Sequence, residues 1–284
     1  MRIFVRHATT YCYDRPARSV NQILRMTPRP HVGQHILDWR IDTDIDCRMK
    51  VTEDSFGNLV HSFTANGTFE AYTILVEGQV IIDDRTGFIQ GAIERMRPAL
   101  YLRETELTAC DAAIRDFARK MSDGREPLTT LHEMNNYLFT HMAFDTEATG
   151  TTTTAPQAFA AHHGVCQDFA HVLIAAARAL GIPARYVSGY MVHEDDSVVH
   201  EAGHAWMEAL IPDYGWIAFD PANGVSPTYR HVRVATGLDY LSAAPARGVQ
   251  RGGSSERMDV SVLTQDCDGA ALGMRQSQDQ HPLS

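Results

Sequence analysis

Residues 164–190 read GVCQDFAHVLIAAARALGIPARYVSGY, and this segment is the most informative part of the chain about its fold. Apolar residues recur at helical spacing from Val165 to Leu180, which predicts a helix that begins near Cys166. The sequence GIP at 181–183 ends that helix, and the β-branched and aromatic residues after it predict a strand. A lone cysteine therefore stands where a glycine turn ends and an apolar helix begins.

The start of a helix is a favourable position for a nucleophilic cysteine. Unpaired N–H groups and a partial positive charge of about +0.5 stabilise a thiolate there. The same N–H groups can hold a developing oxyanion, which contributes about 10²–10³ in rate for each donor. Gly164 lets a substrate approach the backbone closely. We therefore take Cys166 as the candidate nucleophile, with its own N–H as one oxyanion donor and a second donor unidentified.

A base and a group that orients it are found on two predicted strands further along the chain. His204 opens the segment HAWMEALI, and Asp220 follows the segment GWIAF. Residues 212–215, with the sequence PDYG, predict a hairpin turn between these strands. An antiparallel pair would bring the two side chains together. The imidazole would then take the thiol proton and later protonate a leaving amine, while the carboxylate would fix the imidazole tautomer.

These segments, together with the threonine-rich loop before them, closely resemble the transglutaminase-like cysteine enzymes of bacteria. The similarity is strongest over about residues 150–225. It implies a papain-like core in which the helix bearing the cysteine packs on an antiparallel sheet bearing the histidine and the aspartate. It also implies acyl transfer through a thioester, without a cofactor. Cys166, His204 and Asp220 are carried over from the family pattern as the candidate triad.

The resemblance leaves the acyl acceptor open. We favour hydrolysis of peptide or isopeptide amide bonds in a peptide or protein substrate, which would make the chain a cysteine protease or amidase. Transfer of the acyl group to an amine is the first alternative, and a non-catalytic peptide-binding module of the same fold is the second. The acidic calcium-binding loops of the animal enzymes have no counterpart in the sequence, since residues 193–201, HEDDSVVHE, lack an EF-hand pattern.

Four further residues are candidates for the cleft or for support of the triad. Asp168 either caps the first helical turn or binds a substrate amine, and the preference of helix N-termini for anions favours the cap. Trp206 shares a strand face with the candidate base and either walls the cleft or packs in the core. Asn223 shapes the turn after the candidate carboxylate or orients the base. Tyr190 is expected to line the cleft.

Several histidines lie near the nucleophile without forming a metal motif. His162, His163 and His171 surround Cys166 in the sequence, but the HExxH stripe of a helical zinc site is absent. Chance proximity is expected among 14 histidines. We therefore predict no metal and a structural role for His171.

The chain is predicted to have an α+β fold in which an all-β accessory domain precedes the catalytic core. Residues 1–97 are rich in β-branched and aromatic residues, and DSFGN and ANGT within them predict turns between strands. This region also resembles the accessory domain that commonly precedes the core in bacterial members of the family. Residues 98–245 form the predicted core, with helices expected over 104–122 and 127–144.

The C-terminal part of the chain is expected to contain a closing strand and a tail. Residues 246–269 include RMDVSVLTQD, which could form a strand that returns to the sheet, and 270–284 are expected to be disordered. The loop 193–203 is expected to act as a lid over a cleft walled by the accessory domain.

Composition excludes several classes of protein. A net charge of −10 argues against a nucleic-acid partner. No apolar run reaches the roughly 18–20 residues of a membrane span, and the N-terminus lacks the pattern of a signal peptide. Five scattered cysteines form neither a zinc motif nor a disulfide framework. We therefore expect a soluble cytoplasmic protein that does not bind membranes, and the oligomeric state stays open.

Overall fold

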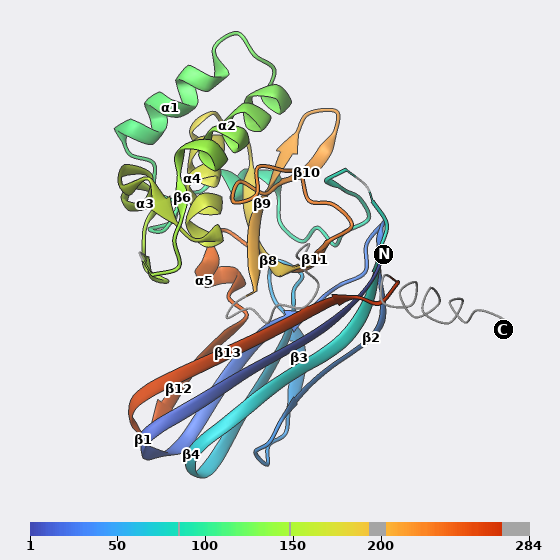
Figure 1. Ribbon diagram of the computed structural model, residues 1–284, viewed down its shortest axis with the longest axis vertical. Helices are drawn as coiled ribbons and strands as arrows, with labels where there is room; N and C mark the ends of the chain where they lie inside the picture. The colour runs from blue at the N-terminus through green and yellow to red at the C-terminus, as the bar shows by residue number, and fades with distance from the viewer. Residues whose placement is uncertain (85, 148, 193–202, 269–284) are drawn as a thin grey trace, which may run out of the picture.

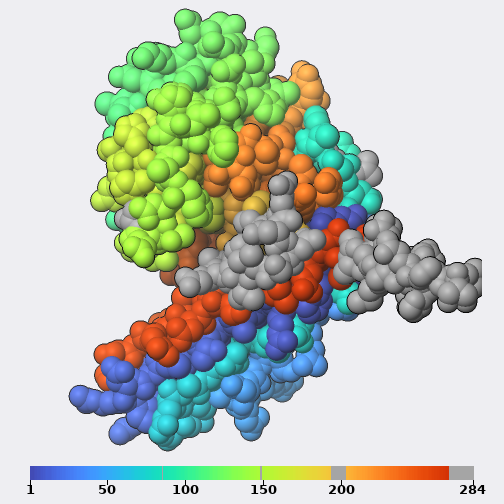
Figure 2. Space-filling view, in the orientation of Figure 1, coloured from blue at the N-terminus to red at the C-terminus, as the bar shows by residue number. Residues whose placement is uncertain are grey.

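The computed structural model describes residues 1–84, 86–147, 149–192 and 203–268. Figure 1 shows two lobes, one made of long strands and the other of helices packed around a second sheet. The space-filling view shows the two lobes in contact along one side of the long strands (Figure 2). Within the described residues, no helix is long and apolar enough to cross a membrane.

Two very long strands form the centre of the N-terminal lobe. β1 (Arg2–Thr27) and β4 (Leu59–Ile82) pair antiparallel along nearly their whole lengths. Buried residues alternate with accessible ones along much of β1, as expected for a sheet with one face on the core. The remaining strands of this sheet are β2 (Gln34–Thr43), β3 (Lys50–Glu53), β12 (Ala246–Arg251) and β13 (Ser254–Asp266).

One of the two turns predicted in this region is present and the other is not. Asp54 begins the turn between β3 and β4, where its Oδ1 accepts hydrogen bonds from the N–H groups of Phe56 and Asn58. Asn66 and Gly67, by contrast, lie inside β4, and Asn66 pairs with Ser19 of β1. The prediction of a turn at ANGT was wrong because ladder hydrogen bonds to the long partner strand outweigh a local turn propensity.

Both ends of the chain meet in the N-terminal sheet. β12 pairs with β1 from Ser19 to Leu24, and β13 pairs with β1 from Ile3 to Arg15. The C-terminal segment thus supplies two strands, and the sheet to which they return is that of the accessory lobe, not that of the core. Residues 270–284, expected to be a disordered tail, lie outside the described residues.

The second lobe is built on a five-stranded antiparallel sheet with the order β11-β8-β9-β10-β5. Its strands are β5 (Phe88–Ile89), β8 (Ala184–Met191), β9 (His204–Ile211), β10 (Gly215–Phe219) and β11 (His231–Gly237). β5 pairs with Trp216 and Ile217 at the edge of this sheet and so belongs to the core. The core sheet therefore includes residues that precede the boundary predicted at residue 97.

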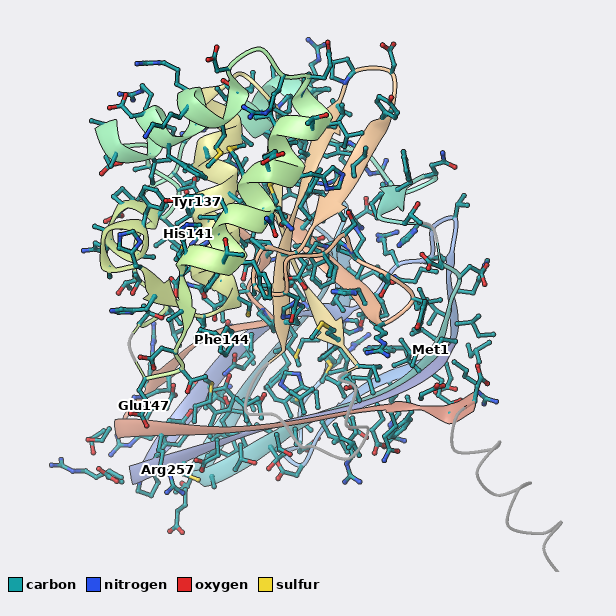
Figure 3. The ribbon with its side chains drawn as sticks, turned by 45° about the horizontal axis from the view of Figure 1, so that its top comes forward. Met1, Tyr137, His141, Phe144, Glu147 and Arg257 are labelled. Atoms are coloured by element: carbon teal, nitrogen blue, oxygen red, sulfur yellow. The ribbon has the colours of Figure 1, made fainter. Side chains whose placement is uncertain are left out.

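Six helical segments of the described residues lie around this sheet. They are η1 (Pro98–Leu102), α1 (Ala112–Ser122), α2 (Pro127–His141), α3 (Ala155–Ala161), α4 (Cys166–Ala179) and α5 (Tyr240–Ala243). Of these, α4 is the one buried among the others. Figure 3 labels Tyr137 and His141, whose rings stack on the last turns of α2. A short parallel pair, β6 (Ala143–Phe144) with β7 (His163–Gly164), then leads to α4.

The boundaries of α1 and α4 follow from local chemistry. α1 begins only at Ala112, because the side chain of Asp111 accepts a hydrogen bond from the N–H of Ile114 and caps the helix. Residues 104–111 of the predicted helix therefore lie outside it. α4 begins at Cys166 as predicted, and Gly181, with φ of +75°, follows its C-terminus. The α+β class is confirmed.

Polar contacts and a continuous apolar core join the two lobes. Gln34 Nε2 donates to the carbonyl of Arg233 (2.8 Å), and Thr264 Oγ1 donates to the carbonyl of Met191 (2.9 Å). The largest buried cluster runs from Ile3 of β1 into α4 without a break. The core sheet is therefore held against the N-terminal lobe by packing as well as by hydrogen bonds.

Candidate active site

Cys166 is the first residue of α4, and the turn before it is fixed by Asp168. The Oδ2 atom of Asp168 accepts hydrogen bonds from the N–H of Val165 (2.9 Å) and from Thr149 Oγ1 (2.7 Å). The Asp168 side chain is buried, and this burial raises the pKa of its carboxyl group against the opposing effect of the two donors. These contacts are those of a helix cap, the first of the two roles considered for this residue.

Gly164 is required by that cap. A Cβ atom at this position would lie 2.6 Å from Asp168 Oδ2, closer than any side chain tolerates. The close approach that was expected for a substrate is thus made by the carboxylate of Asp168. Phe144 pairs in register with Gly164 and is 59% exposed, so an aromatic ring stands open to solvent beside the strand that leads to the nucleophile (Figure 3).

The backbone N–H of Cys166 has no acceptor within the described residues, whereas the N–H groups of Asp168 and Phe169 both bond to the carbonyl of Val165. Free N–H groups are expected at a helix start. The Cys166 N–H is therefore available to hold an oxyanion on an acyl group bound to the adjacent sulfur.

His204 lies at the start of β9 and links the thiol to a carboxylate. Its Nε2 atom is 2.7 Å from Asp220 Oδ2. Burial opposes a charge on the ring, but the negative charge of Asp220, followed by the interaction with Cys166, raises the pKa of His204 to about 10. With Nε2 directed to the carboxylate, Nδ1 is the ring nitrogen left for the sulfur. An imidazolium beside a thiol stabilises the thiolate.

Asp220 follows β10 and is completely buried. In addition to the bond with His204, its Oδ2 atom accepts hydrogen bonds from Asn223 Nδ2 (2.8 Å) and His231 Nε2 (3.0 Å). Its Oδ1 atom accepts the N–H of Ala222 (3.2 Å). Although burial favours the neutral acid, His204 and the other donors hold the pKa of Asp220 well below its usual range. The carboxylate is therefore a fixed negative charge behind the imidazole.

Asn223 shapes the turn after Asp220 and donates a hydrogen bond to its carboxylate, while a direct role in orienting His204 stays a prediction. Its backbone N–H donates to Asp220 Oδ1 (3.3 Å), which shapes the turn, and its side-chain Nδ2 lies 3.4 Å from His204 Nε2. It therefore sits against the imidazole–carboxylate pair.

The sequence prediction missed His231. This residue opens β11 and lies outside both motifs that identified His204 and Asp220. Only the pairing of β11 with β8, next to β9, brings it to the site. No local pattern in YRHVRV signals this role, so a prediction would have needed the strand order.

His204, Asp220 and His231 also form a group whose ligand-type atoms lie within 4.8 Å of one another. A zinc ion would need an unprotonated Nε2 on His231. The Nδ1 atom of that ring already accepts the N–H of Thr228 (3.2 Å), so Nε2 carries the proton. The distances of 2.7 and 3.0 Å to Asp220 are those of hydrogen bonds. The group is accordingly a hydrogen-bonded network.

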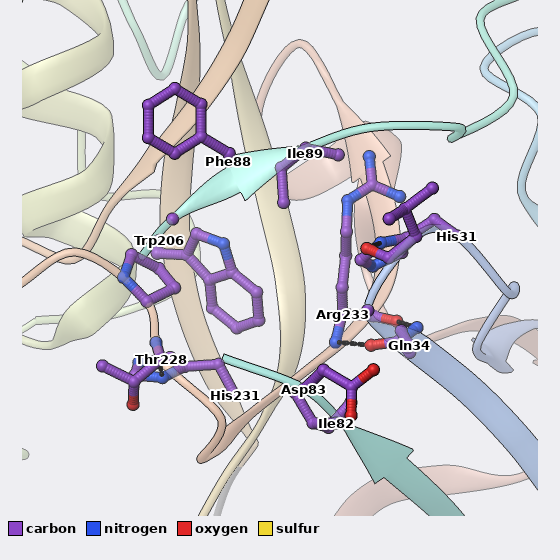
Figure 4. A pocket seen from close by; sticks show the side chains of 14 residues that line it. His31, Gln34, Ile82, Asp83, Phe88, Ile89, Trp206, Thr228, His231 and Arg233 are labelled. Carbon is purple, nitrogen blue, oxygen red and sulfur yellow. Dashed lines mark hydrogen bonds between the residues drawn. The ribbon is translucent and has the colours of Figure 1, made fainter. Parts of the chain in front are cut away.

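Trp206 belongs to the core. It is 1% exposed, packs with Val187 and Ala218, and meets the ring of His231 edge to face at 5.4 Å. It also lines a cavity of about 40 Å³ between the two lobes (Figure 4), across which lies His31. Of the two roles considered for Trp206, packing in the core is the one that its contacts support.

Tyr190 and His171 have their contacts away from the thiol–imidazole pair. The Tyr190 hydroxyl lies 3.1 Å from His7 Nδ1 on β1, so this side chain joins the lobes, and its expected place in a cleft stays a prediction. His171 is fully buried and its Nε2 accepts the N–H of Tyr240 (3.1 Å). Burial lowers the pKa of His171 to about 3, which fits its predicted structural role. The proposed lid falls almost wholly on residues 193–202, outside the described residues.

Comparison with known proteins places both parts of the chain. Residues 115–221 match the model of the transglutaminase-like superfamily, and residues 3–81 match that of the bacterial transglutaminase-like N-terminal region. An uncharacterized protein of Mycobacterium leprae is 28% identical over 273 residues, covering 92% of this chain and 97% of that one. A protein-glutamine gamma-glutamyltransferase of Pseudomonas aeruginosa is 34% identical over 112 residues, covering 34% of this chain and 16% of that protein.

A solved structure has the same fold over nearly the whole chain. The crystal structure from Cytophaga hutchinsonii described as a "putative cysteine protease" superposes with a TM-score of 0.75 at 23% identity, covering 94% of this chain and 92% of that chain. The arrangement of the two lobes is thus shared with that protein.

Proposed function

Since this chain belongs to the transglutaminase-like superfamily and carries its bacterial N-terminal region, we propose that it is a thiol-dependent acyl-transfer enzyme acting on peptide or isopeptide amide bonds. Cys166 is the nucleophile, His204 the acid–base group and Asp220 the carboxylate that orients it. The observation that carries the proposal is the 2.7 Å hydrogen bond from His204 to a buried carboxylate, made by a ring that also interacts with a thiol at a helix start.

The reaction follows from these positions. The Cys166 thiolate attacks the amide carbon, and the carbonyl oxygen takes up the negative charge near the Cys166 N–H. The carbon–nitrogen bond then breaks as the His204 imidazolium gives its proton to the leaving amine, which leaves a thioester and a neutral imidazole. His204 next removes a proton from water, the hydroxide adds to the thioester, and the carboxylic acid departs from the regenerated thiolate. The Asp220 carboxylate keeps its charge throughout.

Water as the acceptor is our first choice, and amine transfer is the second candidate. The similarity to a protein-glutamine gamma-glutamyltransferase favours the second candidate, but it extends over only 34% of this chain. The presence of all three side chains, with His204 bonded to Asp220 and its pKa raised in part by Cys166, argues against a binding module that has lost its chemistry.

Mass spectrometry of a glutamine-containing peptide incubated with the protein, with and without an excess of primary amine, tests the proposal. Hydrolysis converts the side-chain amide to the acid or cleaves the peptide, while transfer gives an amine adduct. Cys166→Ala should abolish every product. Cys110→Ala, which removes another partly buried thiol, is the matched control and should keep full activity. Product from Cys166→Ala at the wild-type rate would refute the role of the thiol.

The cytoplasmic location and the peptide or protein partner remain predictions from the sequence. Cell fractionation with an antibody against the chain tests the location. Capture on immobilised peptides by Cys166→Ala, which binds without turnover, tests the class of partner.

A further inference from the structure

We propose that His231 is a positioning residue for this chemistry: as a neutral donor it holds the Asp220 carboxylate in the place from which that carboxylate orients His204. The inference rests on the proposed function for its catalytic consequence. Its structural part stands on the contacts of the described residues alone, and it adds a fourth side chain to the candidate triad.

The tautomer of His231 follows from its two hydrogen bonds. Nδ1 lies 3.2 Å from the backbone N–H of Thr228, which can only donate, so Nδ1 is an acceptor. In the neutral ring the proton must then be on Nε2, which lies 3.0 Å from Asp220 Oδ2. His231 therefore donates to the same oxygen that accepts from His204. The turn that closes with the His231 N–H on the Thr228 carbonyl (3.1 Å) holds the ring in this orientation.

Packing fixes the ring and keeps it neutral. His231 is 7% exposed, and its ring meets the indole of Trp206 edge to face at an interplanar angle of 86°. Burial lowers the pKa of His231, against the opposing effect of Asp220. His204 is thus the charged imidazole partner of Asp220, and the neutral ring of His231 does not compete with it for the negative charge of the carboxylate.

The other ionisable groups around His231 are few within the described residues. Asp220 faces it from the end of β10, and His204 faces it from β9. Across the cavity of Figure 4, His31, Asp83 and Arg233 line the same space. Arg233 is engaged by Glu208 at 2.7 Å, so its charge is already paired.

The expected effect concerns the position and charge of Asp220. Without the His231 donor, the carboxylate loses one of three donors to Oδ2, and its ionised form is less stable. The rate of catalysis, which needs the Asp220 carboxylate paired with the His204 imidazolium, should then begin to fall at a higher pH on the acid side of its pH profile. The loss of one hydrogen bond to a charged group corresponds to about 10–100-fold in rate.

Two variants separate the donor from the shape of the ring. His231→Phe keeps an aromatic ring against Trp206 but removes the donor, whereas His231→Gln loses the ring and retains an N–H donor. We expect His231→Phe to lower kcat by about 10–100-fold with KM nearly unchanged, and His231→Gln to recover most of the loss. The buried His7→Phe is a matched control for loss of a buried histidine and should keep the wild-type pH profile. Near-UV circular dichroism reports whether each variant is folded.

A second measurement does not depend on turnover. The pH dependence of Cys166 alkylation by iodoacetamide, followed by peptide mapping, should show its acidic limb at higher pH in His231→Phe than in the wild type or in His231→Gln. If the wild type has no activity on amides but this shift is present, the proposed function fails and the positioning role stands. Equal profiles and equal kcat in folded His231→Phe, or equal losses in the Phe and Gln variants, would overturn the inference.

Discussion

Two carboxylates in the core lobe are equally buried but have partners of different chemistry. Asp220 accepts from His204 and His231, whereas Glu208 on β9 accepts from Arg185 (2.6 Å) and Arg233 (2.7 Å). Both side chains are 0% exposed. A guanidinium keeps its proton at every physiological pH, while an imidazole can give its proton away. The same burial therefore produces a structural ion pair in one place and a reactive pair in the other.

The surroundings of the two sites fit this difference. The Arg185 guanidinium is enclosed by a second carboxylate, Glu94 (2.8 Å), and by the ring of Trp216 at 3.8 Å. Burial opposes its charge, but Glu208 and Glu94 raise the pKa of Arg185. Arg185 and Arg233 also hold the pKa of Glu208 at about 2 despite its burial. The Arg185–Glu208 pair therefore stays charged near neutral pH, and its contribution is to stability.

The largest effect is expected for Asp220→Asn. The amide keeps the shape of the side chain but removes the charge that raises the pKa of His204, and it can present a donor where an acceptor is needed. We expect kcat to fall by about 10⁴-fold, as for a triad with the wrong histidine tautomer. Single-turnover kinetics measures this loss. A fall of less than tenfold in a folded variant would mean that the imidazole does not depend on this carboxylate.

The complementary change, Glu208→Gln, should affect stability instead. It leaves Arg233 without its carboxylate and Arg185 with Glu94 alone, and the removal of one member of a buried ion pair typically costs about 3–5 kcal/mol of unfolding free energy. We expect kcat of the folded fraction to stay within about threefold of wild type. Urea unfolding measures the loss, with Glu77→Gln, which removes a half-buried surface carboxylate paired with Arg6, as a control. Equal loss of kcat in Glu208→Gln and Asp220→Asn would remove the distinction between the two carboxylates.

A smaller effect is expected from pH. The native pKa values of His171, about 3, and His7, about 4, lie below the ordinary value of 6.5. Below pH 6.5 these histidines therefore take up protons in the unfolded chain but not in the native state, and the free energy of unfolding falls as the pH drops. His204 has the opposite sign: its stabilisation is complete below about 6.5 and is lost as the pH rises through about 10.

Urea unfolding at pH 7 and pH 5 tests the acid side of this dependence. One fully buried neutral histidine such as His171 accounts for about 1–2 kcal/mol of loss between these two values. His171→Gln should show a correspondingly smaller loss, while the exposed His35→Gln should follow the wild type. An unchanged pH dependence in His171→Gln would show that this ring is protonated in the native state.

Most features that depend on residues close together in the sequence could be predicted, whereas features that depend on distant residues could not. The segments around Cys166, His204 and Asp220 could be predicted because each contains its own signal: a helix start, a strand opening and a strand end. The Asp168 cap was also predictable, since it acts within one turn. The role of Gly164 was not, because it depends on the rotamer of that carboxylate.

Long-range pairings explain the remaining differences. His231 reaches Asp220 only through the order of strands in the core sheet, and Tyr190 meets His7 only through the contact between lobes. Asn66 has a strong local turn signal that the β1–β4 ladder overrides. None of these outcomes can be obtained from a single segment of the chain.

The most direct test of the central claim, that His204 activates the thiol of Cys166, is the rate of iodoacetamide alkylation of each cysteine at pH 6. We predict that Cys166 in the wild type reacts before Cys12, Cys47, Cys110 and Cys267, and that His204→Ala slows it by about tenfold or more while the other four are unaffected. Equal alkylation rates of Cys166 in the wild type and in folded His204→Ala would contradict the account.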